Sequence, residues 1–116
     1  MLNFSPKRAY IKEEVIKIKE EDKKRLLSPV TPENYFRVAN GTIIKGLMDF
    51  DNSLENMGEE TFRYHVNDYR NDFSTWIRDT IKDEKLANEL LLTKEKSRTQ
   101  VLVLRRIIHI LGDSDE

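Results

Sequence analysis

The chain has 116 residues, of which 38% are hydrophobic and 35% are charged, and its formal net charge is −1. This length suits one ordinary domain with a modest core and a heavily charged surface. Because the chain contains no cysteine, disulfides and zinc sites with cysteine ligands are excluded.

Residues 1–27 are predicted to form a charged N-terminal arm that is helical or partly disordered. Ser5 and Pro6 suit the start of a helix. The alternation in VIKIK is also typical of a strand, so both readings stay open. A loose apolar stripe runs through this charged segment: Tyr10, Ile11, Val15, Ile16 and Ile18. Residues 28–34 then contain two prolines, which predict a linker.

The clearest local signal is YFRVANGTIIKG. Asn40-Gly41 is the pair favoured in a type I′ turn, in which both central residues have positive φ. Aromatic and β-branched residues flank it on both sides. The sequence therefore predicts a short antiparallel hairpin over about residues 35–45, with one face packed on helices.

Three helices are predicted next from apolar residues at helical spacing. The first ends before Gly58, the second follows it, and Asn71 or Asp72 caps the third. A further short helix is expected after a cap at Asp83. The expected buried residues are Leu47, Phe50, Leu54 and Met57; then Phe62, Val66 and Tyr69; then Phe73, Trp76, Ile77 and Ile81; then Leu86 and Leu90, with Leu91 as a further candidate.

The last helix is predicted to start near Ser97 and to stop before Gly112. Its expected apolar stripe is Val101, Leu104, Ile108 and Leu111, widened by Leu102, Val103, Ile107 and Ile110. So much apolar surface on a terminal helix requires deep burial or a partner chain. The β-branched residues also leave a strand open as the alternative.

His65 is the first residue to weigh as a functional group. With Asp68 and Asp72 nearby in sequence, it could serve as a general base, because a carboxylate orients an imidazole and raises its pKa. We favour a structural role that locks a joint between two helices, since no nucleophile pattern accompanies it. Trp76 is expected in the core, with its indole N–H donating to Asn67 or Asn71. The candidate binding residues are His65, Asn67, Asp68, Asn71, Asp72, Trp76 and Arg78.

The basic residues form a second candidate surface. Residues 1–27 and 94–112 carry a basic excess, whereas residues 28–93 and the last four residues are acidic. The basic segments either fold back on the acidic middle, which we favour, or bind a polyanion such as nucleic acid. The residues concerned on the last helix are Arg98, Arg105, Arg106 and His109. No spacing typical of a metal or cofactor site is present, so neither is expected.

Part of the chain resembles a known family. YFRVANGTIIKGL, LENMGEETFRYHVN and NDFSTWIRDTIKDEKLANEL, from Tyr35 to about Leu92, are similar to a small family of uncharacterised prokaryotic domains that is frequent in archaea. The resemblance includes an HVN stretch followed by N-D-F-x-x-W-[IV]-R-D. It implies one helical unit with a hairpin, from about Tyr35 to Leu111, and it implies no particular activity.

These patterns together predict a mainly α-helical α+β protein. Its expected parts are an arm (1–27), a linker (28–34), a helical domain with one hairpin (35–112) and an acidic tail (113–116). Without a signal peptide or a run of ~20 apolar residues, the chain is expected to be cytoplasmic and free of membrane contact. The favoured function is a non-enzymatic interaction or regulatory module that binds a protein partner or itself. The alternatives are a nucleic-acid-binding accessory protein and a small enzyme centred on His65.

Overall fold

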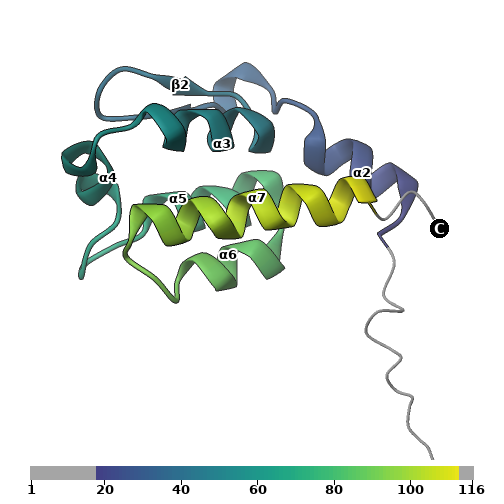
Figure 1. The fold of residues 1–116 in the computed structure, drawn as a ribbon. Helices are drawn as coiled ribbons and strands as arrows, with labels where there is room; N and C mark the ends of the chain where they lie inside the picture. Colours follow the sequence, from purple (N-terminus) through teal and green to yellow (C-terminus); the bar gives the residue numbers. More distant parts are fainter. Residues whose placement is uncertain (1–17, 113–116) are drawn as a thin grey trace, which may run out of the picture.

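The computed structural model describes residues 18–112, which fold into helices and one antiparallel hairpin (Figure 1). This confirms the predicted mainly helical α+β class. The predictions for residues 1–17 and for the acidic tail lie outside the described residues. In chain order the elements are α2 (Glu20–Leu27), a 3-10 turn (Pro32–Asn34), β1 (Phe36–Arg37), β2 (Ile43–Ile44), α3 (Leu47–Asn56), α4 (Glu59–His65), α5 (Asp72–Trp76), a π-helical turn (Ile77–Ile81), α6 (Glu84–Leu90) and α7 (Lys96–Gly112).

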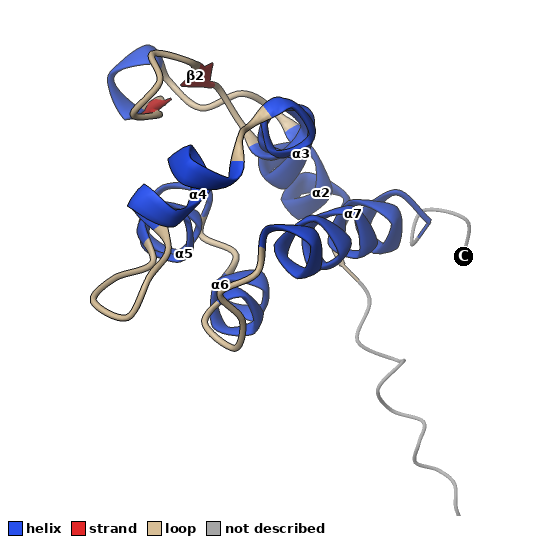
Figure 2. Ribbon diagram, turned by 60° about the vertical axis from the view of Figure 1, so that its left-hand side comes forward, coloured by secondary structure: helices blue, strands red, loops and turns tan. Residues whose placement is uncertain are grey.

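The helices surround a single core. In Figure 2 the helices α3, α7, α6 and α5 form a ring, and α4 lies beside α5 below the hairpin. α7 packs against α3 and α6, and α5 packs against α6. Phe50, Phe62 and Phe73 are fully buried at the centre, and the ring of Phe73 lies 5.0 Å from that of Phe50 and 6.0 Å from that of Phe62. The apolar spacing of these helices therefore predicted most of the interior.

The hairpin is present, but its turn differs from the predicted type I′. Phe36 pairs with Ile44, and Arg37 with Ile43. Gly41 has a φ of 96°, whereas Asn40 does not have a positive φ. Val38 N–H donates to Thr42 O at 2.8 Å, and Gly41 N–H donates to Val38 O at 2.8 Å. These bonds make a three-residue loop, the kind in which a type I turn is followed by a glycine bulge.

The second half of the predicted arm is part of the domain. Leu26 of α2 is buried in the core, and α2 contacts both α3 and α7. Arg25 Nη1 donates to the carbonyl of Ile81 at 2.6 Å, at the end of the π-helical turn. The linker is also held, because Val30 N–H donates to Lys45 O at 2.8 Å. Basic residues of the arm thus fold back on the rest of the chain.

The predicted stripe from Phe62 through Val66 to Tyr69 is wrong at its last residue. α4 ends at His65, and a β-bridge between Val66 and Asn71 reverses the chain. Tyr69 lies at the tip of this reversal and is 94% exposed. When the helical spacing is extrapolated past the end of α4, it predicts burial for a residue that lies at the surface.

The caps of the next two helices are where the sequence predicted them. Asn71 Oδ1 accepts from Ser74 N–H at 3.0 Å, and Asp83 Oδ1 accepts from Leu86 N–H at 3.2 Å. Trp76 is buried as predicted, but its indole N–H donates to the carbonyl of Asn34 at 2.8 Å, not to Asn67 or Asn71. The indole therefore joins α5 to the turn before the hairpin. Leu91 is not part of the core, because it is more than half exposed.

Lys82 ends the π-helical turn in a left-handed conformation, with φ 66° and ψ 41°. A side chain with a Cβ is strained there, and glycine is not. We therefore expect Lys82→Gly to raise the free energy of unfolding by about 0.5–1 kcal/mol. Urea denaturation measures this change, with Lys82→Ala as the control that removes the ammonium and keeps the Cβ. A gain from alanine as large as that from glycine contradicts the explanation.

The last helix is confirmed in its extent, but its expected stripe faces outward. Val101, Leu104, Ile108 and Leu111 are between 43% and 59% exposed. The buried residues are the other set, which are Leu102, Val103, Ile107 and Ile110 together with Thr99. α7 therefore uses one apolar face for the core and presents a second one at the surface. Neither α7 nor any other helix among the described residues has the length and apolar character to cross a membrane.

Candidate functional site

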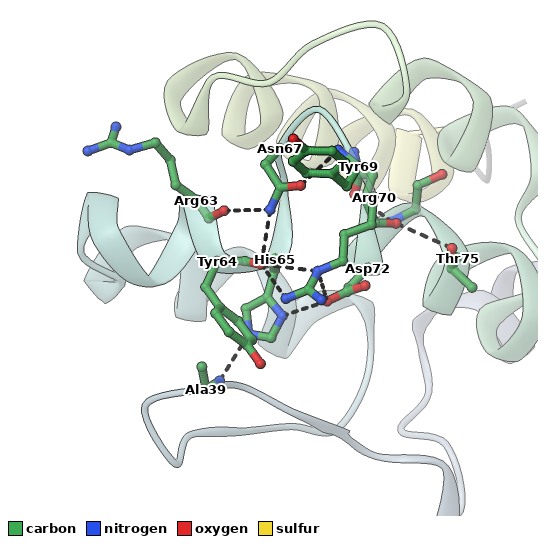
Figure 3. Close-up of polar contacts among 11 residues, drawn as sticks. Ala39, Arg63, Tyr64, His65, Asn67, Tyr69, Arg70, Asp72 and Thr75 are labelled. Atoms are coloured by element: carbon green, nitrogen blue, oxygen red, sulfur yellow. Dashed lines mark hydrogen bonds and ion pairs between the residues drawn. The ribbon is translucent and has the colours of Figure 1, made fainter.

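His65 lies at the end of α4 with both ring nitrogens engaged (Figure 3). Nε2 accepts the backbone N–H of Ala39 at 2.9 Å, and Nδ1 lies 3.0 Å from Oδ2 of Asp72. An N–H donor on one side and a carboxylate on the other assign the tautomer, with the proton on Nδ1. The imidazole therefore ties the hairpin to α4 and to the start of α5.

Aromatic rings enclose this imidazole. The ring of Phe36 lies 5.2 Å from it edge to face, that of Phe73 lies at 5.1 Å, and that of Tyr64 at 5.0 Å. His65 is only 4% exposed. A general base must reach its substrate with a free nitrogen, and neither nitrogen of His65 is free or open to solvent in this arrangement. The geometry suits a structural joint.

The neighbouring residues shape the reversal between α4 and α5. Asn67 Nδ2 donates to Arg63 O at 2.9 Å and to Tyr64 O at 3.3 Å, while its Oδ1 accepts from Tyr69 N–H at 2.9 Å. Arg70 stacks on Tyr64 with its guanidinium 4.5 Å from the ring centre. These contacts satisfy backbone groups at the end of α4, as helix ends require.

Asp72 serves two partners at once. Its Oδ2 faces His65 Nδ1 at 3.0 Å and Arg70 Nε at 3.3 Å. Arg70 also donates through Nη2 to the carbonyl of Tyr64 at 2.6 Å. The carboxylate thus closes a small polar network around the reversal, and its oxygen Oδ2 is occupied by side chains of this chain.

The structure brings only some of the predicted binding residues together. Asn67, Asp68 and Asn71 line a hollow of about 290 Å³ at the reversal, where Lys94 Nζ lies 3.0 Å from Asp68 Oδ1. His65 and Asp72 are not among the lining residues. The indole N–H of Trp76 donates to the carbonyl of Asn34. Arg78 lies further along the chain, with Nη2 3.5 Å from Ser74 Oγ. The seven residues therefore do not form one niche.

The predicted basic surface of α7 divides in two. Arg106 is almost buried and pairs with Asp83, Nε to Oδ2 at 2.8 Å and Nη2 to Oδ1 at 3.2 Å. Its Nη1 also lies 3.3 Å from Nδ1 of His109. Arg98 and Arg105 are exposed and form no ion pair within residues 18–112. The sequence identified Asp83 as a cap, but nothing local indicated its pairing with Arg106 across 23 residues.

Two charged edges border the exposed apolar stripe of α7, which we call the α7 face (Val101, Leu104, Ile108 and Leu111). At 100° per residue, Arg98 and Arg105 fall along one side of it, and we call them the basic edge. On the other side Gln100 Nε2 donates to Glu55 Oε1 of α3 at 2.7 Å. Asp51 lies one helical turn before Glu55, and together these two residues form the acidic edge.

Within residues 18–112, no cation compensates the acidic edge. Burial and the neighbouring Glu55 carboxylate both raise the pKa of Asp51, and burial is the larger cause. Neither Asp51 nor Glu55 forms an ion pair with any residue in the described part of the chain. A positive side chain placed here would relieve the repulsion between the two carboxylates. The α7 face is thus an apolar strip between a basic and an acidic border.

A metal site finds no support in this arrangement. No group of three or more His, Asp or Glu side chains among residues 18–112 is placed to hold an ion. His65 and His109, the two histidines, lie at different ends of the fold: one is in the joint and the other is on the last turns of α7.

Comparison with protein families gives one finding. The model of a family of unknown function, DUF5752, matches residues 59–115, from the start of α4 through α7. The chain is therefore similar to an uncharacterised small domain, as the sequence predicted, whereas the predicted motif and archaeal origin stay predictions. The matched region includes both the His65 joint and the α7 face. The searches of curated proteins and of solved structures returned no match.

Proposed function

We propose that the protein is a non-enzymatic interaction module and that the α7 face is its docking surface for an amphipathic helix of a partner protein. The observation that carries this proposal is the set of four large apolar side chains, each about half exposed, along one helix. Contiguous exposed apolar side chains with charged borders are typical of interaction sites.

The spacing favours a helix as the ligand. Val101, Leu104, Ile108 and Leu111 follow the alternating three- and four-residue steps of a coiled-coil seam, onto which a second helix packs. A specific, stable interface generally buries ~800 Å² on each partner, and an obligate dimer buries more. Four half-exposed side chains offer much less than that, so the face fits a reversible contact with one helix better than a permanent dimer.

The two edges favour a ligand with split charge. Arg98 and Arg105 attract carboxylates on one flank of the bound helix, while Asp51 and Glu55 attract lysine or arginine on the other. Each exposed pair contributes only ~0.2–1 kcal/mol. Their combined effect is mainly to select the direction and the sequence of the bound helix.

The geometry of His65 supports the non-enzymatic part of this proposal. The imidazole is covered by aromatic rings, and its nitrogens are used by Ala39 and Asp72. In this proposal the joint holds the hairpin against α4 and α5, and so keeps the core on which α7 rests. It takes no part in binding the ligand helix.

A designed peptide tests the proposal. The probe is a fluorescent helix of about 21 residues, three heptads, with leucine in the seam, glutamate along one flank and lysine along the other. We expect it to bind the full chain in fluorescence anisotropy, and to bind about 5–10-fold more tightly than a peptide with glutamine on both flanks, as two or three surface pairs imply.

Protein variants locate the contact. Leu104→Glu in the middle of the α7 face is expected to abolish peptide binding, while Leu92→Glu, at another exposed leucine, leaves it unchanged. Equal loss from both variants contradicts the assignment, and so does no loss from either. Sedimentation that reveals a dimer abolished by Leu104→Glu identifies a second copy as the occupant and overturns the partner-helix proposal.

A further inference from the structure

We propose that the hollow between α2 and the end of α7 is the anchor site for the docked helix. The hollow takes one large apolar side chain of the partner, and Lys23 at its wall pairs with a carboxylate side chain of the same helix. This inference rests on the proposed function, because the hollow continues the α7 face. It adds the residue types that the partner helix carries near one of its ends.

The hollow lies where α2 meets the last turns of α7 (Figure 1). Its volume is about 320 Å³. The lining residues are Glu20, Lys23, Lys24, Leu27, Ile110 and Leu111. Leu111 is also the last residue of the α7 face, so the two surfaces are continuous. A helix that packs along the α7 face therefore reaches the hollow at one of its ends.

The apolar part of the lining suits an anchor side chain. Ile110 is fully buried, whereas Leu27 is only partly buried and Leu111 is about half exposed. These two leucines thus keep exposed carbon surface at the wall of a space that has room for one leucine or phenylalanine side chain. An anchor placed there removes apolar surface of the protein and of the partner from water. Single side chains that fill such pockets contribute much of the affinity of an interface.

Lys23 distinguishes this hollow from an ordinary surface groove. It is 6% exposed, although lysine is almost never fully buried without a partner. Within residues 18–112 its one ion pair is with Glu20, and the distance from Nζ to Oε1 is 3.7 Å. That distance is too long for a hydrogen bond, and the Glu20 side chain is 82% exposed. Among the described residues, the Lys23 ammonium is therefore poorly compensated.

A carboxylate next to Lys23 gains more than one next to an exposed lysine. Folding has already removed most of the water around Lys23, so pairing adds little desolvation cost on the side of the protein. Lys24 lines the same hollow but is exposed, and a pair there gains only the small amount typical of surface pairs. The partner helix is thus expected to carry aspartate or glutamate within one turn of its apolar anchor.

Two longer versions of the designed peptide test the anchor site. Each adds one turn of about four residues, with one leucine and one glutamate, at either the amino or the carboxyl end. Both ends are blocked, so that the peptide has no terminal carboxylate. Because the charged edges set the direction of the bound helix, only one end reaches the hollow. We expect one extension to tighten binding by at least about tenfold in fluorescence anisotropy, and the other to leave it unchanged. A gain from neither, or an equal gain from both, overturns the inference.

Removal of one charge on each side locates the carboxylate. With glutamine in place of the added glutamate, the wild-type chain is expected to bind the peptide about fivefold less tightly. Lys23→Met keeps the length of the side chain without its charge, so it is expected to bind both peptides equally. Lys24→Met is the matched control, in which the fivefold difference remains. A difference that survives Lys23→Met, or one that is lost in Lys24→Met, contradicts the role of Lys23.

The original designed peptide separates this inference from the proposed function. It lacks the added turn, so the wild-type chain and Lys23→Met are expected to bind it equally, which also shows that the variant is folded. Binding of the original peptide with no gain from either extension overturns the anchor site alone. Binding of neither the original nor the extended peptides overturns the docking function of the α7 face and the anchor site with it.

Discussion

Arg106→Ala is expected to lower the free energy of unfolding by about 3–5 kcal/mol, because it leaves the buried Asp83 carboxylate without its cation. The guanidinium makes two nearly parallel bonds to this carboxylate, at 2.8 and 3.2 Å. Asp83 is 3% exposed in the folded chain, so its charge is stabilised mainly by this guanidinium and not by water. Its Oδ1 also caps α6 through Leu86 N–H, and the loss therefore extends to the start of that helix.

Urea denaturation with two control variants isolates this effect. Arg105→Ala, the exposed neighbour, is expected to change stability by less than ~0.5 kcal/mol. Arg106→Met combined with Asp83→Asn removes both charges, keeps the volume and keeps an oxygen for the cap. This double variant is expected to be more stable than Arg106→Ala, because no buried charge is left alone. Equal stability of Arg106→Ala and Arg105→Ala contradicts the buried pair.

The pair also connects stability to the proposed docking surface. Arg106 can reach Asp83 only when its side of α7 faces α6, which fixes the rotation of the helix about its axis. That rotation buries Val103, Ile107 and Ile110 and turns Val101 and Ile108 outward. We therefore expect Arg106→Ala, in the fraction that stays folded, to weaken peptide binding to the α7 face as well.

Local signals in the sequence were sufficient for much of this fold. Asn71 and Asp83 were identified as caps from the sequence alone. A short polar side chain can accept the unpaired N–H three residues later in the first helical turn, and this contact depends on no other part of the chain. The helix from Leu47 to Asn56 followed from a single apolar stripe with a charged opposite side. The hairpin followed from Asn40-Gly41, although the residues alone do not separate a two-residue turn from the three-residue loop, which depends on strand register.

Long-range contacts decided the rest. α7 is apolar on most of its circumference, so its sequence offers two equivalent stripes, and the pairing of Arg106 with Asp83 selects the one that is buried. Trp76 finds its acceptor 42 residues earlier, at a backbone carbonyl that carries no side-chain signal. The same is true of Ala39, whose N–H fixes the tautomer of His65. Sequence patterns located the joint, but the contacts that assign its role join segments far apart in the chain.

His65→Ala is expected to lower the free energy of unfolding by about 2–4 kcal/mol. The substitution removes the acceptor of the Ala39 N–H and so breaks a part-buried hydrogen bond, which contributes about 0.5–1.5 kcal/mol. It also opens a cavity against Phe36 and Phe73, the two rings that contact the imidazole at 5.2 and 5.1 Å. Tyr69→Ala, at an exposed position in the same reversal, is the matched control and is expected to change stability by less than ~0.5 kcal/mol.

A substitution that keeps a hydrogen-bond acceptor distinguishes a structural role of His65 from a catalytic one, because it restores stability only if the role is structural. The side-chain oxygen of glutamine can take the place of Nε2, so His65→Gln is expected to recover about 0.5–1.5 kcal/mol of the loss by accepting from Ala39 again. Nitrogen-15 NMR of the wild-type chain is expected to show the proton on Nδ1, as the contact with Asp72 requires. A proton found on Nε2 would break the bond to Ala39. Unchanged stability of His65→Ala would remove the reason for placing this imidazole in the joint, and the search for a chemical role would then start from His65 again.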